Sequence, residues 1–229
     1  MSWLWEQVDL YCERIDGHLW SEPLNFFSNF AFYIAAARIF YLRQNVSSPR
    51  YRRELSVLGG LALLIGTGSA FFHSWATRLS QIADVVPIAL FIVTSLYFYI
   101  RSLKSEGIAI KRLLAMAALT LSLPVALAAA AGWGQYLANG VSYLGIAPTL
   151  LLFAGQERVR ERKRRLSIAA GLFILAYIFR TLDQGICDIF PYGTHFLWHL
   201  FTTATAYMMA SIQAATGLRV KPTDKVSPS

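Results

Sequence analysis

Five side chains able to take part in hydrolytic chemistry fall in two short stretches of an otherwise apolar sequence. The stretch "GSAFFHSWATRLSQIAD" carries Ser69, His73 and Asp84, and the stretch "THFLWHLF" carries His195 and His199. Residues four apart share one face of a helix. Catalytic zinc is often held by three protein ligands, histidines among them, with a water in the fourth position. A carboxylate can take a proton from such a water, and a hydroxyl can donate a hydrogen bond to the developing oxyanion.

Each of these residues also has an ordinary structural explanation. A single histidine at a helix end is commonly interfacial or hydrogen-bonded. Ser69, in "GTGSA", is small enough to allow close helix packing. Asp84 in the first turn of a helix is favoured by the helix dipole. A functional interpretation therefore depends on whether the elements that carry the five residues bring them together.

Composition places the chain in a membrane. Of its 229 residues 55% are hydrophobic and only 15% are charged, with a mean hydropathy of +0.44, whereas soluble domains carry about a quarter charged residues. The net charge of +8 is compatible with nucleic-acid binding. The basic residues, however, sit in short clusters between apolar runs, which is the pattern of membrane topology. We therefore expect no nucleic-acid partner, and no obligatory protein partner is evident.

Seven apolar stretches are long enough to cross a bilayer as helices, which predicts an all-α integral membrane protein with seven transmembrane helices. The predicted domains are an acidic, amphipathic N-terminal segment (1–23), a transmembrane catalytic domain (24–216) and a tail (217–229). The expected spans are 24–42, 55–76, 81–101, 110–131, 135–155, 166–187 and 194–216.

The distribution of Lys and Arg predicts the orientation of these spans. The segments 43–53, 101–112 and 156–165 and the tail are basic, whereas the opposite set of connections is poor in Lys and Arg. Cytoplasmic loops carry the Lys/Arg excess, so the N-terminus is expected outside and the C-terminus in the cytoplasm. The compact loops are typical of a multi-pass protein of a bacterial inner membrane.

This topology brings the five residues to one depth. The second span runs outward, which places Ser69 and His73 near its outer end. The third and seventh spans begin outside, so Asp84, His195 and His199 lie near the same face of the membrane. Ionisable groups inside a membrane usually face a cavity and serve a function. Three of the four histidines in the chain meet at one level, which predicts a metal site.

The spacing Ser-x3-His-x10-Asp followed by His-x2-Trp-His resembles the alkaline ceramidase family. That family belongs to a superfamily of seven-helix membrane hydrolases that also includes the progestin and adipoQ receptors. The matching text here is "GSAFFHSWATRLSQIAD" and "HFLWH". Near the N-terminus, "CE" and "EPLNFFSN" are similar to the family's Cys-Glu and Glu-x2-Asn-x2-Ser-Asn signature.

The resemblance implies an enzyme that hydrolyses the amide of ceramide, or of a related N-acyl lipid, to a sphingoid base and a fatty acid. Its lipid substrate would enter the helix bundle laterally from the bilayer. The alternative is a lipid receptor or sensor with the same metal core and little hydrolysis, but the complete hydrolytic set favours the enzyme. The implied roles are zinc ligation by His73, His195 and His199, proton acceptance by Asp84, support of the tetrahedral intermediate by Ser69, and lining of the lipid pocket by Trp198.

The family also holds calcium in its N-terminal segment. The candidate ligands here are Asp9, Glu13, Asp16 and Glu22, since calcium binds several carboxylate and carbonyl oxygens in a flexible loop. The distance in sequence from the Cys-Glu pair to the later Glu is shorter than in the family. The alternative is a solvated acidic segment that merely follows the charge asymmetry.

Two further pairs are suggested by the same topology. Cys12 and Cys187, the only two cysteines, both fall on the outer side, where an oxidising compartment would allow a disulfide. Family members similarly pair the N-terminal cysteine, and two free thiols are the alternative. Arg180 and Asp183 are three apart on the sixth predicted helix and are expected to pair with each other.

Overall fold

The computed structural model describes residues 2–103, 110–132 and 140–218, and within these ranges the chain is helical, with no strand. Short 3-10 helices lie at Ser2–Trp5 (η1), Val141–Tyr143 (η3) and Asp183–Ile186 (η4). The α-helices are α1 (Pro23–Ser28), α2 (Phe30–Gln44), α3 (Pro49–Trp75), α4 (Arg78–Ser102), α5 (Ile110–Ala130), α7 (Ile146–Gln156), α8 (Arg160–Leu182) and α9 (His195–Gly217).

A helix stands at each of the seven predicted positions. The first position is filled by α1 and α2 together, because Asn29 between them keeps helical dihedrals (φ −66°, ψ −18°). The fifth position is filled by η3 and α7, and residues 135–139 of that prediction lie outside the described residues. The prediction of an all-helical protein is confirmed for the described part of the chain.

By length and composition, four helices in the described ranges can cross a membrane: Pro49–Trp75, Arg78–Ser102, Leu113–Ala130 and Arg160–Ile186. Their outer surfaces expose large apolar side chains such as Val93, Leu119 and Leu127, as expected of helices that face lipid rather than water. These features indicate a multi-pass membrane protein. That all seven positions span the bilayer stays a prediction.

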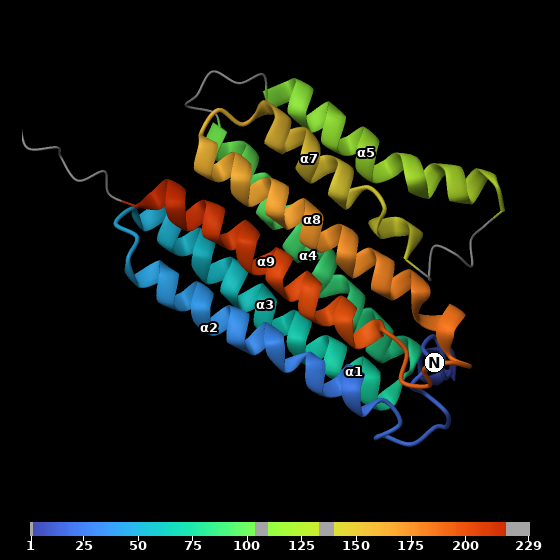
Figure 1. Cartoon of the computed structure of the whole chain (residues 1–229). Coiled ribbons are helices and arrows are strands. Elements are labelled where there is room, and N and C mark those ends of the chain that lie inside the picture. The colour runs from blue at the N-terminus through green and yellow to red at the C-terminus, as the bar shows by residue number, and fades with distance from the viewer. Residues whose placement is uncertain (1, 104–109, 133–139, 219–229) are drawn as a thin grey trace, which may run out of the picture.

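Helix α9 lies inside the bundle, between α3 and α8 in Figure 1, and also packs against α2 and α4. Its buried residues include the polar side chains of His195, His199 and Gln213. The helix with the most buried polar groups is therefore the one most fully enclosed by other helices. Helices α5 and α7 pack against each other on the far side of α8.

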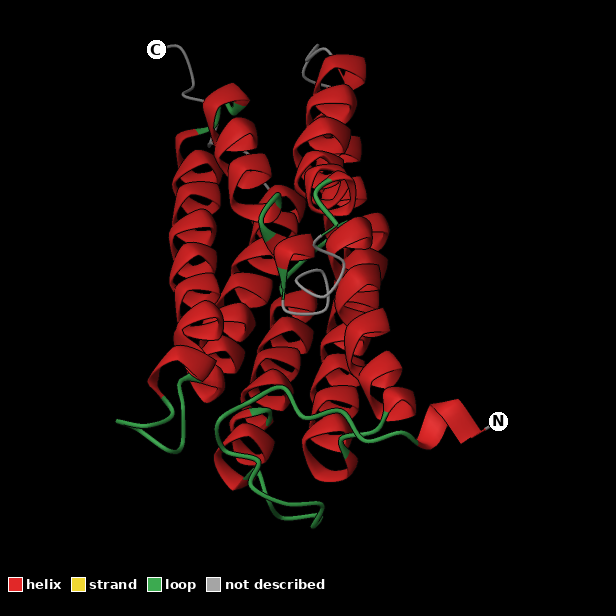
Figure 2. Cartoon of the chain, turned by 90° about the vertical axis from the view of Figure 1, so that its right-hand side faces the viewer, coloured by secondary structure: helices red, strands yellow, loops and turns green. Residues whose placement is uncertain are grey.

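The connection from α3 to α4 is a tight turn that is stabilised by local hydrogen bonds. Ala76 takes a left-handed conformation (φ 41°) and its N–H returns to the carbonyl of Phe72 at 2.7 Å. Thr77 and Ser80 then form a capping box that starts α4. The N-terminal segment is fixed to this turn, because Val8 donates its N–H to Ala76 O at 2.7 Å. Figure 2 shows this segment crossing the end of the helix bundle.

Candidate metal and catalytic site

Three buried histidines meet where the N-terminal segment closes the bundle. His73 comes from the last turn of α3, and His195 and His199 come from the first two turns of α9. All three are at most 2% exposed, and one potential ligand nitrogen from each lies within 4.8 Å of the others. The histidine trio predicted from the sequence is therefore brought together.

The partners of two of these rings determine which nitrogen carries the proton. His73 Nδ1 is 2.5 Å from Glu22 Oε2, a carboxylate oxygen that accepts, so Nδ1 is the donor. Ser28 Oγ donates its only proton to the Asn25 carbonyl at 2.9 Å, and so it must accept from His199 Nδ1 at 2.7 Å. In both neutral rings the Nε2 atom is then left with its lone pair.

Those two lone pairs face each other. His73 Nε2 and His199 Nε2 are 3.1 Å apart, and two acceptors at that distance repel unless a proton or a metal ion lies between them. Two nitrogens on a tetrahedral zinc, each about 2.0–2.1 Å from the ion, would be about 3.3 Å apart. The third ring, His195, has a buried Nδ1 without a hydrogen-bond partner. The donor set therefore fits a metal ion such as Zn²⁺.

Glu22 is the centre of the network that orients His73. Besides the imidazole, its carboxylate accepts from Arg14 Nε at 2.6 Å and from Asn25 Nδ2 at 3.0 Å. Burial of the Glu22 carboxylate opposes its charge, but the nearby His73 and Arg14 outweigh burial, so the pKa of Glu22 lies below its ordinary value. Ionised Glu22 is thus a permanent acceptor for the His73 ring, the kind of outer contact that fixes a ligand's orientation.

Tyr11 covers the remaining ring. Its aromatic ring stacks on His195 with centroids 3.6 Å apart and planes 16° apart. Burial raises the pKa of Tyr11 far above its ordinary value, so its hydroxyl stays neutral. The N-terminal segment therefore contributes both a hydrogen-bonding carboxylate and a packing surface to the histidine site.

Ser69 and Asp84 face the site from neighbouring helices. Ser69 is buried on α3, one turn before His73, and the side chains of Ser69 and His73 are near enough to interact with the Asp84 carboxylate. Asp84 Oδ1 is buried with no hydrogen-bond partner. Asp84 lies in the second turn of α4 rather than the first, since the helix begins at Arg78 after the cap at Thr77. The capping alternative for Asp84 is therefore wrong.

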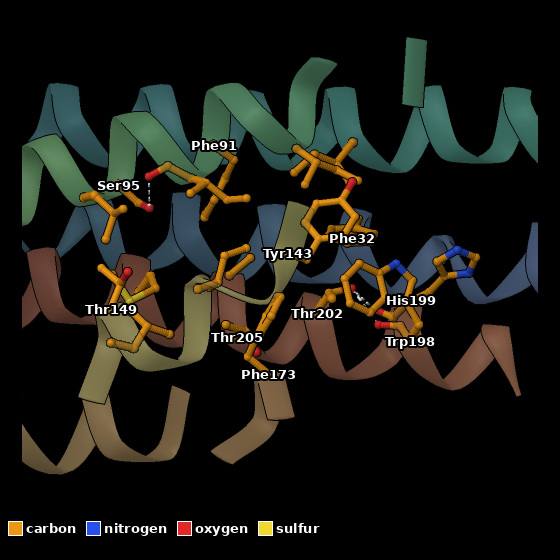
Figure 3. Close-up of a pocket in the computed structure, with 18 of the residues that line it drawn as sticks. Phe32, Phe91, Ser95, Tyr143, Thr149, Phe173, Trp198, His199, Thr202 and Thr205 are labelled. Atoms are coloured by element: carbon orange, nitrogen blue, oxygen red, sulfur yellow. Dashed lines mark hydrogen bonds between the residues drawn. The ribbon is translucent and has the colours of Figure 1, made fainter. Parts of the chain in front are cut away.

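An apolar cavity leads from the histidines into the bundle (Figure 3). Its lining includes Ser69, His199 and the buried Trp198, together with aliphatic and aromatic side chains of several helices. His199 and Trp198 lie at one end of the view, and Ser95 and Thr149 lie toward the other. The hydroxyls of Ser95 and Thr149 are bonded to carbonyls of their own helices, so they leave the cavity wall largely apolar. The apolar lining of this cavity suits a hydrocarbon chain, and His199 stands at one end of it.

Comparison with known protein families identifies the family of the chain. The model of the family described as Ceramidase matches residues 11–226, nearly the whole chain. The chain belongs to the ceramidase family. No curated protein and no solved structure matches it. Family membership implies a hydrolase that acts on the amide bond of a lipid, which agrees with an apolar cavity that ends at a cluster of histidines.

The four acids proposed as calcium ligands do not form a group with metal-ligand spacing in the described part of this ceramidase-family structure. Glu22 accepts a hydrogen bond from His73. Glu13 accepts hydrogen bonds from the N–H groups of Leu24 and Asn25 at 2.6 and 2.8 Å. Asp16 accepts from Ser21 and His18, and these hydrogen bonds hold its pKa below the ordinary value. Asp9 is exposed. Among the described residues the histidine trio is the group placed to hold a metal, so the structure gives the calcium hypothesis no support.

In the structure, a disulfide joins the N-terminal segment to the segment between η4 and α9. Cys12 and Cys187 are bonded, with Sγ atoms 2.00 Å apart, across 175 residues of sequence. Next to the bridge, Asp183 accepts the N–H of Cys12 at 3.0 Å and the N–H groups of Thr194 and His195 at 2.6 and 2.8 Å. The Asp183 carboxylate therefore holds the N-terminal segment against the first turn of α9, where His195 begins the helix.

The expected pair of Arg180 and Asp183 is wrong. The Asp183 carboxylate is occupied by backbone N–H groups, and Arg180 Nη1 instead donates to the hydroxyl of Tyr11 at 2.9 Å. The pairing rule considers one helix in isolation, but Asp183 already belongs to the 3-10 turn η4. There its carboxylate turns toward the start of α9.

Sequence reasoning missed the contributions of Tyr11, Ser28, Asp183 and Arg180. For Ser28 a signal was present: it lies in "EPLNFFSN", the stretch that carries the resemblance at the N-terminus. In the structure Glu22 and Ser28 of this stretch accept hydrogen bonds from the two opposed histidines. Asn25 donates to the Glu22 carboxylate, and Asn29 donates to the Asn25 carbonyl. No comparable local pattern marks Tyr11 or Asp183.

Proposed function

We propose that the chain is a zinc-dependent intramembrane amidohydrolase that cleaves ceramide or a related N-acyl lipid to a sphingoid base and a fatty acid. The observation that carries this proposal is the pair of opposed Nε2 lone pairs at the polar end of an apolar cavity. Within an amidohydrolase family, a cation-binding site at the end of an apolar channel is best explained as the place of amide cleavage.

The proposed roles follow from position. His73, His195 and His199 would hold Zn²⁺, which lowers the pKa of a water to about 7 and polarises a carbonyl. Asp84, with its unpartnered buried oxygen, accepts the proton of the attacking water and passes it to the leaving nitrogen as the C–N bond breaks. Ser69 donates a hydrogen bond to the carbonyl oxygen as negative charge develops there. Trp198 lines the chain-binding cavity.

The proposed membrane arrangement is the one expected from the charge pattern. Residues 24–216 form the seven-span catalytic domain, the segment 1–23 lies outside and the tail 217–229 lies in the cytoplasm. With this orientation the site opens near the outer face, and the substrate enters from the bilayer. The receptor alternative has no specific observation in its favour, because Ser69 and Asp84 accompany the histidines at the cavity.

The first test measures fatty-acid release from an N-acylsphingosine by the detergent-purified protein, with zinc content determined on the same samples. We expect about one zinc per chain and an Asp84→Asn variant that keeps zinc but loses about 10²–10⁴-fold in kcat, the usual contribution of a general base. Asp188→Asn, at an exposed carboxylate, is the matched control and should retain activity. Full activity of Asp84→Asn would exclude the proposed base, and absence of zinc would exclude the metal mechanism.

A further inference from the structure

A second cavity adjoins the apolar channel near the site. Its wall includes Tyr11, Asp84, Tyr143, Arg180 and Trp198. Tyr143 and Trp198 also line the apolar channel, so the two cavities share a wall beside the histidines. A substrate with its acyl chain in the channel would place the group attached to the amide nitrogen in this second cavity.

Within the described part of the chain, Arg180 interacts electrostatically with the Asp84 carboxylate across this cavity but makes no direct ion pair with it. No ion pair involves Arg180 there, and the acid three residues along the chain is occupied by backbone donors. Instead the guanidinium lies between three aromatic rings, with Cζ 5.6 Å from the centroid of Tyr11, 5.5 Å from Tyr143 and 5.1 Å from Trp198. Aromatic faces stabilise a cation but leave its N–H groups unsatisfied.

The hydrogen-bonding capacity of Arg180 is mostly unused. A guanidinium has five N–H donors, and within the described residues only the Tyr11 hydroxyl accepts one of them. Nε is buried without a partner. The Arg180 side chain is half-buried and lines two cavities, so a ligand that enters there can supply the missing acceptors. Guanidinium matches carboxylate and phosphate in geometry as well as in charge.

Asp84 lines the same cavity. Arg180 offsets the charge of the Asp84 carboxylate, and the guanidinium N–H groups that have no partner are still available to an oxyanion that enters beside it. We propose that Arg180, framed by Tyr11, Tyr143 and Trp198, binds an oxyanion on the nitrogen side of the scissile amide, so that the substrate class is an N-acyl lipid with a carboxylate or phosphate a few bonds from the amide. This inference rests on the proposed amidohydrolase function.

The test uses three ligands with one acyl chain and different headgroups. N-palmitoylglycine carries a carboxylate, N-palmitoyl-O-phosphoethanolamine carries a phosphate, and N-palmitoylethanolamine is neutral. For each, kcat/KM of hydrolysis and the rise in melting temperature on binding are measured at fixed salt. We expect kcat/KM for at least one anionic ligand to be about 10- to 100-fold higher than for the neutral one, the range for hydrogen bonds to a charged group. The same anionic ligand should raise the melting temperature more than the neutral one does. The better of the two anions identifies the source of the oxyanion.

Arg180→Gln should bring the ratio of kcat/KM for the anionic ligand to kcat/KM for the neutral ligand close to one. The substitution weakens binding of the anionic ligand and leaves binding of the neutral one nearly unchanged. Arg78→Gln is the matched control, because Arg78 is a partly exposed arginine paired with Glu6, and it should keep the wild-type ratio. If Arg180→Gln does not fold, Arg180→Lys keeps the charge without the two-pronged geometry and should lower the ratio in part.

The outcomes separate this inference from the function on which it rests. Equal binding of all three ligands by the wild type, or tighter binding of the neutral one, overturns the inference. An equal loss of kcat/KM for every ligand in Arg180→Gln also overturns it, since Arg180 would then stabilise the site without distinguishing one headgroup from another. Arg180-dependent binding of an anionic lipid without hydrolysis of any ligand would uphold the inference and overturn the amidohydrolase proposal.

Discussion

At the scale of single residues, the site depends on the groups behind the histidines as much as on the histidines. Glu22 and Ser28 each hold an Nδ1 atom, and by doing so they turn two Nε2 lone pairs toward one point. A ligand whose second nitrogen is fixed in this way is both correctly protonated and correctly oriented before the metal arrives. The N-terminal segment therefore belongs to the site and is more than a cover for it.

Replacing Glu22 by glutamine should weaken zinc binding about 10- to 100-fold, the usual effect of losing an outer partner of a histidine ligand. The neutral amide is a weaker acceptor for His73 and leaves buried Arg14 without its counter-ion. Competition with a chelator of known zinc affinity measures the change. Glu6→Gln is the matched control, because Glu6 is exposed and pairs with Arg78. Unchanged zinc affinity in Glu22→Gln would show that His73 is oriented without it.

At the scale of elements, helical periodicity explains why part of the site could be predicted from the sequence. Ser69 and His73 share a face of α3, and His195 and His199 share a face of α9, because four residues make about one turn. Membrane depth then brings the two helices level. Neither rule determines how closely α3 approaches α4, and that distance decides whether Ser69 and Asp84 can act together.

Gly68 permits that approach. A Cβ added there would clash with the carbonyl oxygen of Ala83, the residue before Asp84. We expect Gly68→Ala to push α3 and α4 apart, to lower the free energy of unfolding by about 1–3 kcal/mol as other overpacked sites do, and to reduce kcat by separating Ser69 from Asp84. Thermal unfolding and single-turnover hydrolysis measure the two effects.

Gly60 provides the control on the same helix, since a Cβ there meets nothing within 4 Å. Alanine is the better helix former, so Gly60→Ala should be neutral or slightly stabilising. If both variants behave alike, the closeness of α3 and α4 at Gly68 is not what keeps Ser69 and Asp84 in place.

At the scale of the whole molecule, the contacts that sequence reasoning missed are those between segments far apart along the chain. Tyr11 on His195 and Cys12 on Asp183 join the N-terminal segment to the loop before α9. The N-terminal segment has no helical repeat and no apolar run from which its path could be inferred. Its acidic residues therefore suggested a calcium site. In the structure the segment folds back over the bundle, so that Glu13 contacts the start of α1 and Glu22 contacts His73.

The same long-range closure allows a test of orientation with the chain's own cysteines. Cys12 and Cys187 are the only two in the sequence, and they lie beside the site that we place near the outer face. In spheroplasts, a membrane-impermeant maleimide should therefore label the protein only after reduction by an impermeant phosphine, because the thiols are first held in the disulfide.

A variant with both cysteines replaced by serine and with Ser47→Cys added is the control. Ser47 is exposed in the loop between α2 and α3, which the excess of Lys and Arg around it places in the cytoplasm. This variant should react only after the membrane is permeabilised. Labelling of Cys12 and Cys187 only in permeabilised samples would reverse the orientation and place the opening of the site, with its substrate entry, on the cytoplasmic side.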